Sequence, residues 1–504
     1  MSAASDEVPV FTPMDLAAEV PIRATAARRR PSRLGLLVLA ADLLVLIGTY
    51  LVLVLFFDQV AVDMWHLAVW CAALVLTWVF VASGRAYSTG VLHEPLQSAY
   101  VGGKLTLITG AVFYLAPLIG GGGNSRFSNL TVVLVVALAM ACWRALLAVF
   151  APASTEDLVV VGAGWAGQAL AEAFADRPDC GMHIVAFVDA DNRFAGRLIH
   201  GARVHPIEEL STLVHRPHGL ARVVLANAGH AHTAVFDQLT TLGEANVEIV
   251  QMSTLFEQVT GRIPVRHLGN YWWAVLPRPT SDTLYWLGKR TMDILVSVLG
   301  LACLAVLLPL LWPIMRHQTG GSLFFSQQRI GKHGRPFTVR KLRTLPVAPA
   351  GEQLDWQARK AANNPTPLCV RVRAVGLDEV PQLLNVLRGD MSLVGPRPYV
   401  TQEVEEFQRQ IPFFRSRALV RPGVTGWAQT NYGYGLSIDD EVEKLQHDLY
   451  YIGHQSTYLD MLILARTVLV AFRGRRPISR VSLSALPKLA LYALSGSSLS
   501  DKSA

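Results

Sequence analysis

Four long apolar stretches in the first third of the chain restrict what it can fold into. They cover residues 34–57, 65–82, 105–119 and 130–150. The first and last are long enough to cross a lipid bilayer, and the middle two are marginal. Hydrophobic residues make up 51% of the 504 residues and charged ones only 16%, which is too apolar for a wholly soluble protein. We therefore expect four membrane spans, the first of which is too long for a cleaved signal peptide.

The basic residues predict the orientation of these spans. Arginines cluster before the first span, whereas the loop 58–64 that follows it contains no Lys or Arg. The positive-inside rule places the N-terminus in the cytoplasm and, after four spans, everything beyond residue 151 there as well. Asp42 and Arg144 lie inside the first and fourth spans, where facing lipid would be costly, so we expect both to face other helices.

Net charge and cysteine content limit the kinds of ligand and partner that we expect for this chain. The net charge of +7 and the pI of about 9.2 suit a lipid surface or a phosphate substrate. Nucleic acid is not expected, because the chain has no nucleic-acid reader motif. The five cysteines have no CxxC spacing, which predicts free thiols instead of a zinc site or a disulfide framework.

A glycine fingerprint occupies the middle of the chain. In "DLVVVGAGWAGQALAEAF" a strand pattern runs into Gly162, Gly164 and Gly167 and then into a helix pattern. A second strand pattern, "HIVAFVDAD", contains Asp189 at the place where dinucleotide folds carry a ribose-binding acid. We expect a Rossmann-like α/β domain with these four residues as candidate nucleotide ligands, although the fold alone does not establish bound NAD.

A fifth apolar run, residues 294–315, poses a topological problem. A full crossing would place the rest of the chain outside the cell, away from nucleotide-activated substrates. Basic residues flank both ends, here Lys289 and Arg316, which favours the cytoplasmic side for both. Pro309 and Pro313 interrupt the run, and an interior proline breaks or kinks a helix. We predict a re-entrant helix, residues 291–316, with a break at Pro309.

A basic hairpin and an acidic pair follow. "FFSQQRI-GKHGR-PFTVRKL" predicts a β-hairpin that holds a phosphate group or forms a solvated or headgroup-facing surface. In "GLDEVPQLLNVLRGDMSLVGPRP" apolar residues recur at helical spacing, so that Asp378 could be an N-cap ahead of Glu379, with Gly389 ending the helix. Arg397 lies between two prolines, either as a pre-positioned phosphate ligand or within a structural turn. A later helix, residues 457–476, is either interfacial or packed into a core.

From residue 289 to residue 475 the chain resembles the polyprenyl-phosphate sugar-1-phosphate transferases, or bacterial sugar transferases. The resemblance rests on "KRTMDILVS", "LFFSQQRIGKHGRPFTVRKLRT", "GLDEVPQLLNVLRGDMSLVGPRP", "VRPGVTGWAQTNYGYG" and "KLQHDLYYI", in that order. The N-terminal half is similar to the large members of that family. The resemblance implies a cytoplasmic segment 1–33, four transmembrane helices in 34–150, a Rossmann-like domain in 151–275, an α/β monotopic catalytic domain in 285–475 and a tail in 476–504.

The resemblance also implies roles for individual residues. Asp378 would be the nucleophile and Glu379 would help to hold Mg²⁺, with Asp448 as a further acid near the metal. Phosphate or substrate contacts would come from Arg329, Lys341, Arg343, Arg373, Arg397 and Gln429. A helix N-terminus would keep Asp378 ionised, and a carboxylate is a competent nucleophile for phosphoryl transfer.

The implied activity is transfer of a sugar-1-phosphate from a UDP-sugar, UDP-glucose or UDP-galactose, to undecaprenyl phosphate. UMP would leave and a phosphosugar–aspartyl intermediate would form, initiating surface polysaccharide synthesis at the bacterial inner membrane, with a homodimer possible. A membrane-anchored NAD-dependent epimerase or dehydrogenase is the alternative enzyme. It could use Tyr285 and Lys289, but we expect these at a membrane surface and the match to be accidental. A non-catalytic nucleotide-sensing scaffold is the third alternative.

Overall fold

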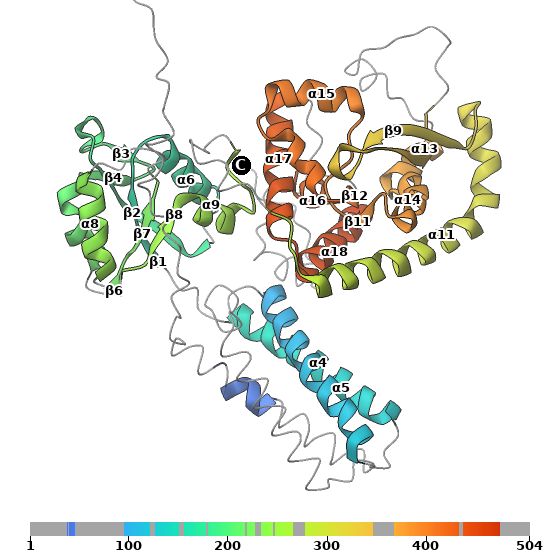
Figure 1. The fold of residues 1–504 in the computed structure, drawn as a ribbon, viewed down its shortest axis with the longest axis horizontal. Coiled ribbons are helices and arrows are strands. Elements are labelled where there is room, and N and C mark those ends of the chain that lie inside the picture. The colour runs from blue at the N-terminus through green and yellow to red at the C-terminus, as the bar shows by residue number, and fades with distance from the viewer. Residues whose placement is uncertain are drawn as a thin grey trace, which may run out of the picture. The chain divides into compact units, whose positions relative to one another are not determined.

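The structure is a computed structural model, shown in Figure 1. It describes residues 38, 40–45, 95–120, 126–150, 156–177, 180–216, 219–226, 233–244, 247–265, 278–345, 367–432 and 437–473. The chain divides into two compact units, Met1–Ala151 and Pro152–Ala504. The predicted segment 1–33, the span 65–82, the tail 476–504 and most of the first span lie outside the described residues.

The first unit contains two long helices, α4 (Pro95–Gly120) and α5 (Arg126–Phe150). The predicted stretches 105–119 and 130–150 lie within them, while their crossing of a membrane stays a prediction. Asp42 accepts hydrogen bonds from Arg144 at 3.0 and 2.5 Å, and both side chains are buried. The prediction that these two charges face protein is therefore confirmed. Gly102 makes room for the arginine, since a Cβ there would lie 3.0 Å from its Cγ.

The second unit begins with a six-stranded sheet in the order β3-β4-β2-β1-β7-β8. All neighbours are parallel except β3 and β4. The strands are β1 (Glu156–Val161), β2 (Met182–Asp189), β3 (Leu198–Ile199), β4 (Ala202–Pro206), β7 (Arg222–Leu225) and β8 (Ile249–Gln251), beside a small hairpin of β5 (His215–Arg216) and β6 (Gly219–Leu220). The central strand β1 is buried on both faces, as expected for a parallel sheet covered by helices.

Helices cover both faces of this sheet. One apolar cluster joins it to α6 (Trp165–Ala175) and α9 (Met252–Thr260), and a second joins it to α7 (Leu210–Val214) and α8 (Thr233–Glu244). Figure 1 shows the strands between α8 and the α6–α9 pair. The 3₁₀ turns η4 (Asn192–Phe194) and η5 (Ile207–Glu209) connect the strands. This part is therefore a three-layer α/β arrangement.

The rest of the unit is an α/β region that carries the basic hairpin and the acidic pair. The predicted hairpin is confirmed, with β9 (Phe324–Ile330) antiparallel to β10 (Pro336–Leu342) around η7 (Lys332–Gly334). A second pair, β11 (Ser392–Val394) and β12 (Gly423–Thr425), is parallel. The helices are α11 (Thr283–Thr319), α13 (Pro367–Ala374), η8 (Leu377–Gln382), α14 (Leu383–Arg388), α15 (Thr401–Gln410), η9 (Phe414–Leu419), α16 (Trp427–Asn431), α17 (Ile438–Gly453) and α18 (Thr457–Arg473).

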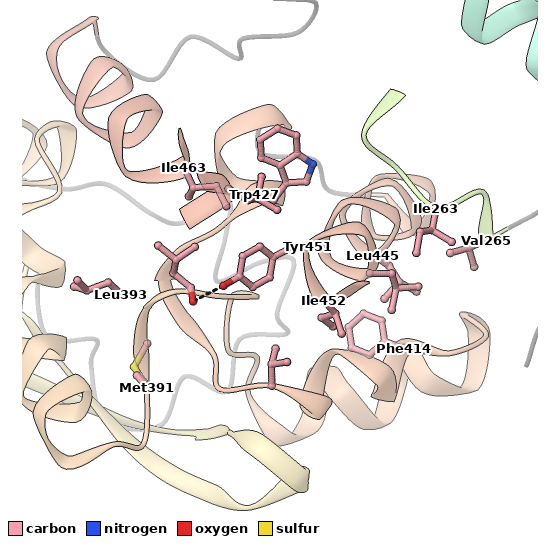
Figure 2. Packing of buried hydrophobic residues seen from close by; sticks show 14 of the residues in the cluster. Ile263, Val265, Met391, Leu393, Phe414, Trp427, Leu445, Tyr451, Ile452 and Ile463 are labelled. Atoms are coloured by element: carbon pink, nitrogen blue, oxygen red, sulfur yellow. Dashed lines mark hydrogen bonds between the residues drawn. The ribbon is translucent and has the colours of Figure 1, made fainter. Parts of the chain in front are cut away.

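One core holds these elements together. Figure 2 shows Tyr451 among apolar side chains, with a dashed hydrogen bond from its hydroxyl, which lies 3.1 Å from the carbonyl oxygen of Val394. Leu459 and Ile463 of α18 belong to this core, while Val468 on the same helix is exposed. One face of the predicted helix 457–476 therefore packs into the core. Ile263 and Val265, which follow α9, also join it and tie the six-stranded sheet to this region.

Helix α11 differs from every other element of this region in its surface. Among the described residues it is the helix that is long and apolar enough to cross a membrane, and only 11% of its most apolar window is buried. Asp282 caps its start and Gly320, with φ of +67°, ends it. The predicted interruption at Pro309 is not found, because one helix runs through Pro309 and Pro313, and Figure 1 shows it bending in its second half. The bend fits the kink that interior prolines produce.

Candidate active site

The acidic pair lies in a 3₁₀ turn that continues into α14. Gly376, with φ of +74°, begins the turn and accepts a hydrogen bond from the amide of Glu379 at 3.1 Å. The expectation that Asp378 is the N-cap is therefore wrong, because the left-handed glycine takes that position and moves the acid into the first turn. Gly389, with φ of +90°, ends α14 directly after Arg388, as predicted.

Glu379 is the centre of a charged group. Lys341 of β10 donates to its Oε1 at 2.6 Å, and Arg397 contacts the same oxygen at 3.4 Å. The lysine and glutamate side chains are both mostly buried, at 17% and 14% exposed. Asp378 is 8% exposed beside them. The structure thus brings the predicted dyad together with two of the predicted phosphate ligands, one from the hairpin and one from the Gly-Pro-Arg-Pro turn.

Burial and like charge shape the basic side of this group. Burial lowers the pKa of Lys341 to about 8, with a further lowering by the neighbouring Arg397 and an opposing effect of Glu379. Burial also lowers the pKa of Arg329 to about 10, again with a contribution from Arg397. Cations held close together out of water are stabilised by an added anion. The group is therefore suited to an anionic ligand such as a phosphate.

Close backbone packing fixes the turn that presents Arg397. The amide of Gly395 donates to Thr425 at 2.9 Å, and the amide of Gly423 donates to Pro396 at 2.9 Å. A Cβ on Gly395, Gly423 or Gly426 would overlap backbone atoms of the neighbouring segment. Three glycines are thus needed for the ends of β11 and β12 to approach each other.

Two other predicted phosphate ligands bind backbone in the structure. Arg329 donates to the carbonyl oxygen of Pro398 and, at 3.1 Å, to Gln327, so it supports the turn on its far side. Arg343 donates to the carbonyl oxygen of Ser322 at 2.9 Å, at the root of the hairpin. The described contacts of Arg343 therefore lie away from Glu379, and those of Arg329 reach the site through the turn.

Arg373 and Gln429 lie in two other elements of the catalytic region. Arg373 lies near the end of α13, and its carbonyl oxygen accepts a hydrogen bond from Gly376 at 3.1 Å, directly before the dyad. Gln429 of α16 donates to the carbonyl oxygen of Val424 at 3.1 Å, while its Oε1 is buried with no hydrogen-bond partner in the described part of the chain. A buried acceptor of this kind is available to a ligand donor.

Asp448 lies in a separate buried ion pair. Arg417 donates to its carboxylate, and the guanidinium also lies 4.3 Å from the ring centroid of Tyr399. Burial raises the pKa of Asp448 to about 6, against the pull of Arg417. Its described contacts therefore hold η9 against α17, and none joins it to Glu379. Within the described residues, no three His, Cys, Asp or Glu side chains group as metal ligands.

The glycine fingerprint of the six-stranded sheet is built as predicted. Gly162 has φ of +112°, and a Cβ on Gly167 would overlap its carbonyl oxygen, so helix α6 packs tightly on the turn. Gly164 faces open space at the start of α6. The Asp189 carboxylate, predicted to bind a ribose, instead contacts the glycine turn, because its Oδ2 accepts a hydrogen bond from the amide of Ala163 at 2.7 Å.

Sequence reasoning did not predict the buried polar network at the start of α11. Tyr285 and Lys289 were expected at a membrane surface, but both are 6% exposed and both bind Asp460, at 3.0 and 2.8 Å. That expectation is wrong because the carboxylate from α18 draws them into the core. Asp293 lies nearby and is 1% exposed. A charge spaced four residues from Lys289 in an apolar run was the available signal.

Comparison with known proteins places this region in a family. Residues 284–474 match the family model described as "Bacterial sugar transferase". The UDP-N-acetylgalactosamine-undecaprenyl-phosphate N-acetylgalactosaminephosphotransferase of Aeromonas hydrophila is 37% identical over 46% of this chain and 54% of its own length. The match thus spans about half of that relative.

Two further matches come from a curated relative and from a solved structure. The UDP-glucose:undecaprenyl-phosphate glucose-1-phosphate transferase of Caulobacter vibrioides is 38% identical over 38% of this chain and 71% of its own length. Among solved structures, UDP-D-quinovosamine 4-dehydrogenase from Vibrio fischeri aligns with 22% of this chain and 88% of its own, at 24% identity and a TM-score of 0.18. By its match to the family model and to the Caulobacter relative, the chain belongs to the bacterial sugar transferase family.

Proposed function

We propose that this protein transfers a sugar-1-phosphate from a UDP-sugar to undecaprenyl phosphate and releases UMP. One observation carries the proposal: Glu379 lies between Lys341 and Arg397, directly beside the buried Asp378. A carboxylate pair among fixed cations suits a reaction in which negative charge moves between phosphates. The Aeromonas and Caulobacter relatives are named for transfers of this kind, which supports the assignment.

The reaction proceeds in two displacements. A carboxylate oxygen of Asp378 attacks the sugar-bearing phosphorus, and the bond from that phosphorus to the bridging oxygen breaks. UMP leaves with the bridging oxygen, and a phosphosugar–aspartyl intermediate, an acyl phosphate, forms. An oxygen of undecaprenyl phosphate then attacks the same phosphorus, which restores the Asp378 carboxylate and yields the lipid-linked diphosphate sugar. Lys341 and Arg397 hold the phosphate oxygens during both steps.

The donor set near the dyad suits Mg²⁺. This ion is commonly held by one or two carboxylates together with substrate phosphates, and a dedicated cage of protein ligands is not required. Glu379 is the residue that would hold it, and the ion would neutralise the diphosphate. The participation of Asp448, which its resemblance to a family acid implies, would require the loss of its contact with Arg417.

The apolar surface of α11 suits delivery of the lipid substrate. Both ends of this helix pack on the same region, since Met292 and Leu301 join the main core while Leu304 and Met315 join a cluster with β10 and α13. A bent helix anchored at both ends enters and leaves the bilayer on one side. We therefore place the catalytic region on the cytoplasmic face of the inner membrane, behind four N-terminal spans.

For the six-stranded part we propose a Rossmann-like domain with a structural glycine turn. Gly164 leaves room for a nucleotide phosphate at the start of α6, while Asp189 is committed to the turn itself.

Whether the chain forms a homodimer remains a prediction. An epimerase or dehydrogenase reaction has little support, because Tyr285 and Lys289 are buried against Asp460. The names of the relatives give no support to a non-catalytic scaffold.

Purified full-length protein in vesicles with Mg²⁺ and undecaprenyl phosphate tests the proposal. A panel of UDP-glucose, UDP-galactose and UDP-N-acetylgalactosamine is assayed for UMP release. We expect release with one of these sugars and loss of release in Asp378→Asn. UMP release from none of them, or an Asp378→Asn variant as fast as the wild type, would contradict the proposal. Omission of undecaprenyl phosphate is the control, and turnover should then stop after one equivalent of UMP.

A further inference from the structure

The start of α11 carries a stripe of buried polar residues. Tyr285, Lys289, Asp293 and Ser297 recur every fourth residue, which places them on one face of the helix, and none is more than 6% exposed. The surrounding surface is apolar and exposed, for example at Leu295, which is 66% exposed. A helix with polar residues inside and apolar residues outside inverts the pattern of a soluble helix. Its polar face is therefore built for contact with the catalytic region.

The first contact of this face is with α17 and α18. Lys289 donates to Asp460 at 2.8 Å and to the hydroxyl of Tyr451 at 2.9 Å. The same Tyr451 hydroxyl lies 2.8 Å from Asp460 and 3.1 Å from the carbonyl oxygen of Val394 in β11. Burying an amino group is costly unless it is paired and hydrogen-bonded, and Lys289 is both. This network fixes the rotation and height of α11 against the core.

The second contact comes from Arg290, beside this face, and reaches the helix that follows the dyad. Arg290 donates to the carbonyl oxygens of Val386 and Leu387 at 2.6 and 2.7 Å. These carbonyls belong to the last turn of α14, where backbone acceptors lack helical partners and where the helix dipole favours a cation. Helix α14 continues directly from the turn that holds Asp378. Arg290 thereby holds the helix that directly follows the 3₁₀ turn η8, in which the nucleophile lies.

The third contact reaches the strand that leads into the turn with Arg397. Asp293 accepts the amide of Leu393 at 2.9 Å and the hydroxyl of Ser392 at 3.1 Å. Both donors lie in β11, and the chain passes from this strand through Gly395 to Arg397. Asp293 thereby holds the strand from which the phosphate ligand projects.

We propose that Arg290 and Asp293 are positioning residues that set the distance between Asp378 and Arg397. Three residues apart on one helix, they bind α14 and β11, which adjoin the two turns that carry these groups, so docking of the membrane helix assembles the site. The inference rests on the proposed function. A displacement of about 1 Å in such a site can slow the reaction by about a hundredfold.

Pre-steady-state UMP release from full-length protein in vesicles, without undecaprenyl phosphate, separates positioning from folding. The amplitude of the first turnover counts folded sites, and its rate constant reports their geometry. In Arg290→Gln and Asp293→Ala we expect an amplitude within twofold of wild type and a rate lower by roughly tenfold to a hundredfold. Asp293→Asn should recover most of the rate, because its amide oxygen still accepts from Leu393.

Arg388→Gln is the matched control. It removes one positive charge from an exposed side chain at the end of α14, the helix that Arg290 binds. The rate of this variant should equal that of wild type. Wild-type rates in Arg290→Gln and Asp293→Ala, or a loss of amplitude at an unchanged rate, would overturn the proposal. So would an Asp293→Asn variant as slow as Asp293→Ala.

Hydrogen exchange of residues 383–398 gives a readout that does not depend on catalysis. We expect faster exchange in Asp293→Ala than in wild type and no change in Arg388→Gln. Exchange as slow as wild type in Asp293→Ala would overturn the positioning role. If wild-type protein released no UMP, the proposed function would fail, while this exchange measurement would still decide whether Asp293 holds β11.

Discussion

Two parts of this protein pack glycines closely beside parallel strands, yet the side chains near the two glycine turns differ in kind. In the six-stranded sheet, Gly167 packs on Gly162 and the carboxylate of Asp189 binds the turn. In the catalytic region, Gly423 packs on Gly395 with the same closeness. The first turn is held by an acid. The second leads to Arg397, which faces Glu379 and Lys341.

The difference separates backbone geometry from chemistry. In both turns the glycines permit a close approach that a Cβ would prevent. Only in the catalytic region do opposite charges from three separate segments, β10, η8 and the turn after β11, meet at the end of the strand. A glycine turn therefore predicts a fold more securely than a function.

The largest effect is expected from a side chain placed in the catalytic glycine pair. Gly423→Ala would drive a Cβ into the backbone of Gly395 and Thr425, which cannot move aside without parting β11 from β12. We expect the free energy of unfolding to fall by about 3 kcal/mol or more and UMP release to be lost. Thermal unfolding in detergent measures the first. Gly288→Ala, whose Cβ meets nothing within 4 Å, is the control and should be neutral or stabilising.

Removal of the charge that follows this turn should come next. Arg397→Gln keeps the fixed backbone but loses a phosphate ligand, so kcat/KM for the UDP-sugar should fall by about a hundredfold. Asp189→Asn makes the matching change in the other turn and should alter kcat/KM less than twofold. Equal effects of the two substitutions would remove the distinction between the turns.

A smaller effect is expected from pH. Lys341 holds phosphate only while protonated, and burial lowers its pKa to about 8. kcat/KM, which reports ionisations of the free enzyme, should therefore fall about tenfold between pH 7 and pH 9. Lys341→Arg stays charged throughout this range and should abolish the fall. A profile that is the same in both proteins would assign the titration to another group.

The smallest effect on UMP release is expected from the other glycine turn. Gly167→Ala should destabilise the six-stranded part by roughly 1–3 kcal/mol, because its Cβ would overlap the carbonyl oxygen of Gly162. UMP release should remain within twofold of wild type. Gly164→Ala faces open space and serves as the control. A loss of UMP release as large as that of Arg397→Gln would make this turn part of the catalytic machinery.

Local patterns in the sequence were sufficient for several elements. Alternating residues around a glycine-rich basic turn predicted β9 and β10, and helical spacing with Gly389 predicted the end of α14. The dyad and its two cations were also expected together. These features depend on neighbours in sequence or on a family motif, so a single sequence contains enough information to find them.

Contacts between distant segments were not predictable in the same way. Gly376 displaced Asp378 from the N-cap because a left-handed residue started the turn earlier. Lys289 moved from the expected surface into the core because Asp460, far along the chain, pairs with it. Asp448 met Arg417 for the same reason. For Lys289 and Asp448 the partner was decided by tertiary packing, and for Asp378 the position was decided by the backbone of the neighbouring Gly376; periodicity describes neither.

Intact-protein and peptide mass spectrometry of the trapped first turnover tests the central claim most directly. Wild-type protein is incubated with Mg²⁺ and its UDP-sugar in the absence of undecaprenyl phosphate and quenched in acid. The account predicts one added sugar phosphate per chain, located on the peptide that contains Asp378, which disappears when undecaprenyl phosphate is supplied and never forms in Asp378→Asn. Full release of UMP without this adduct, or an adduct on another residue, would contradict it.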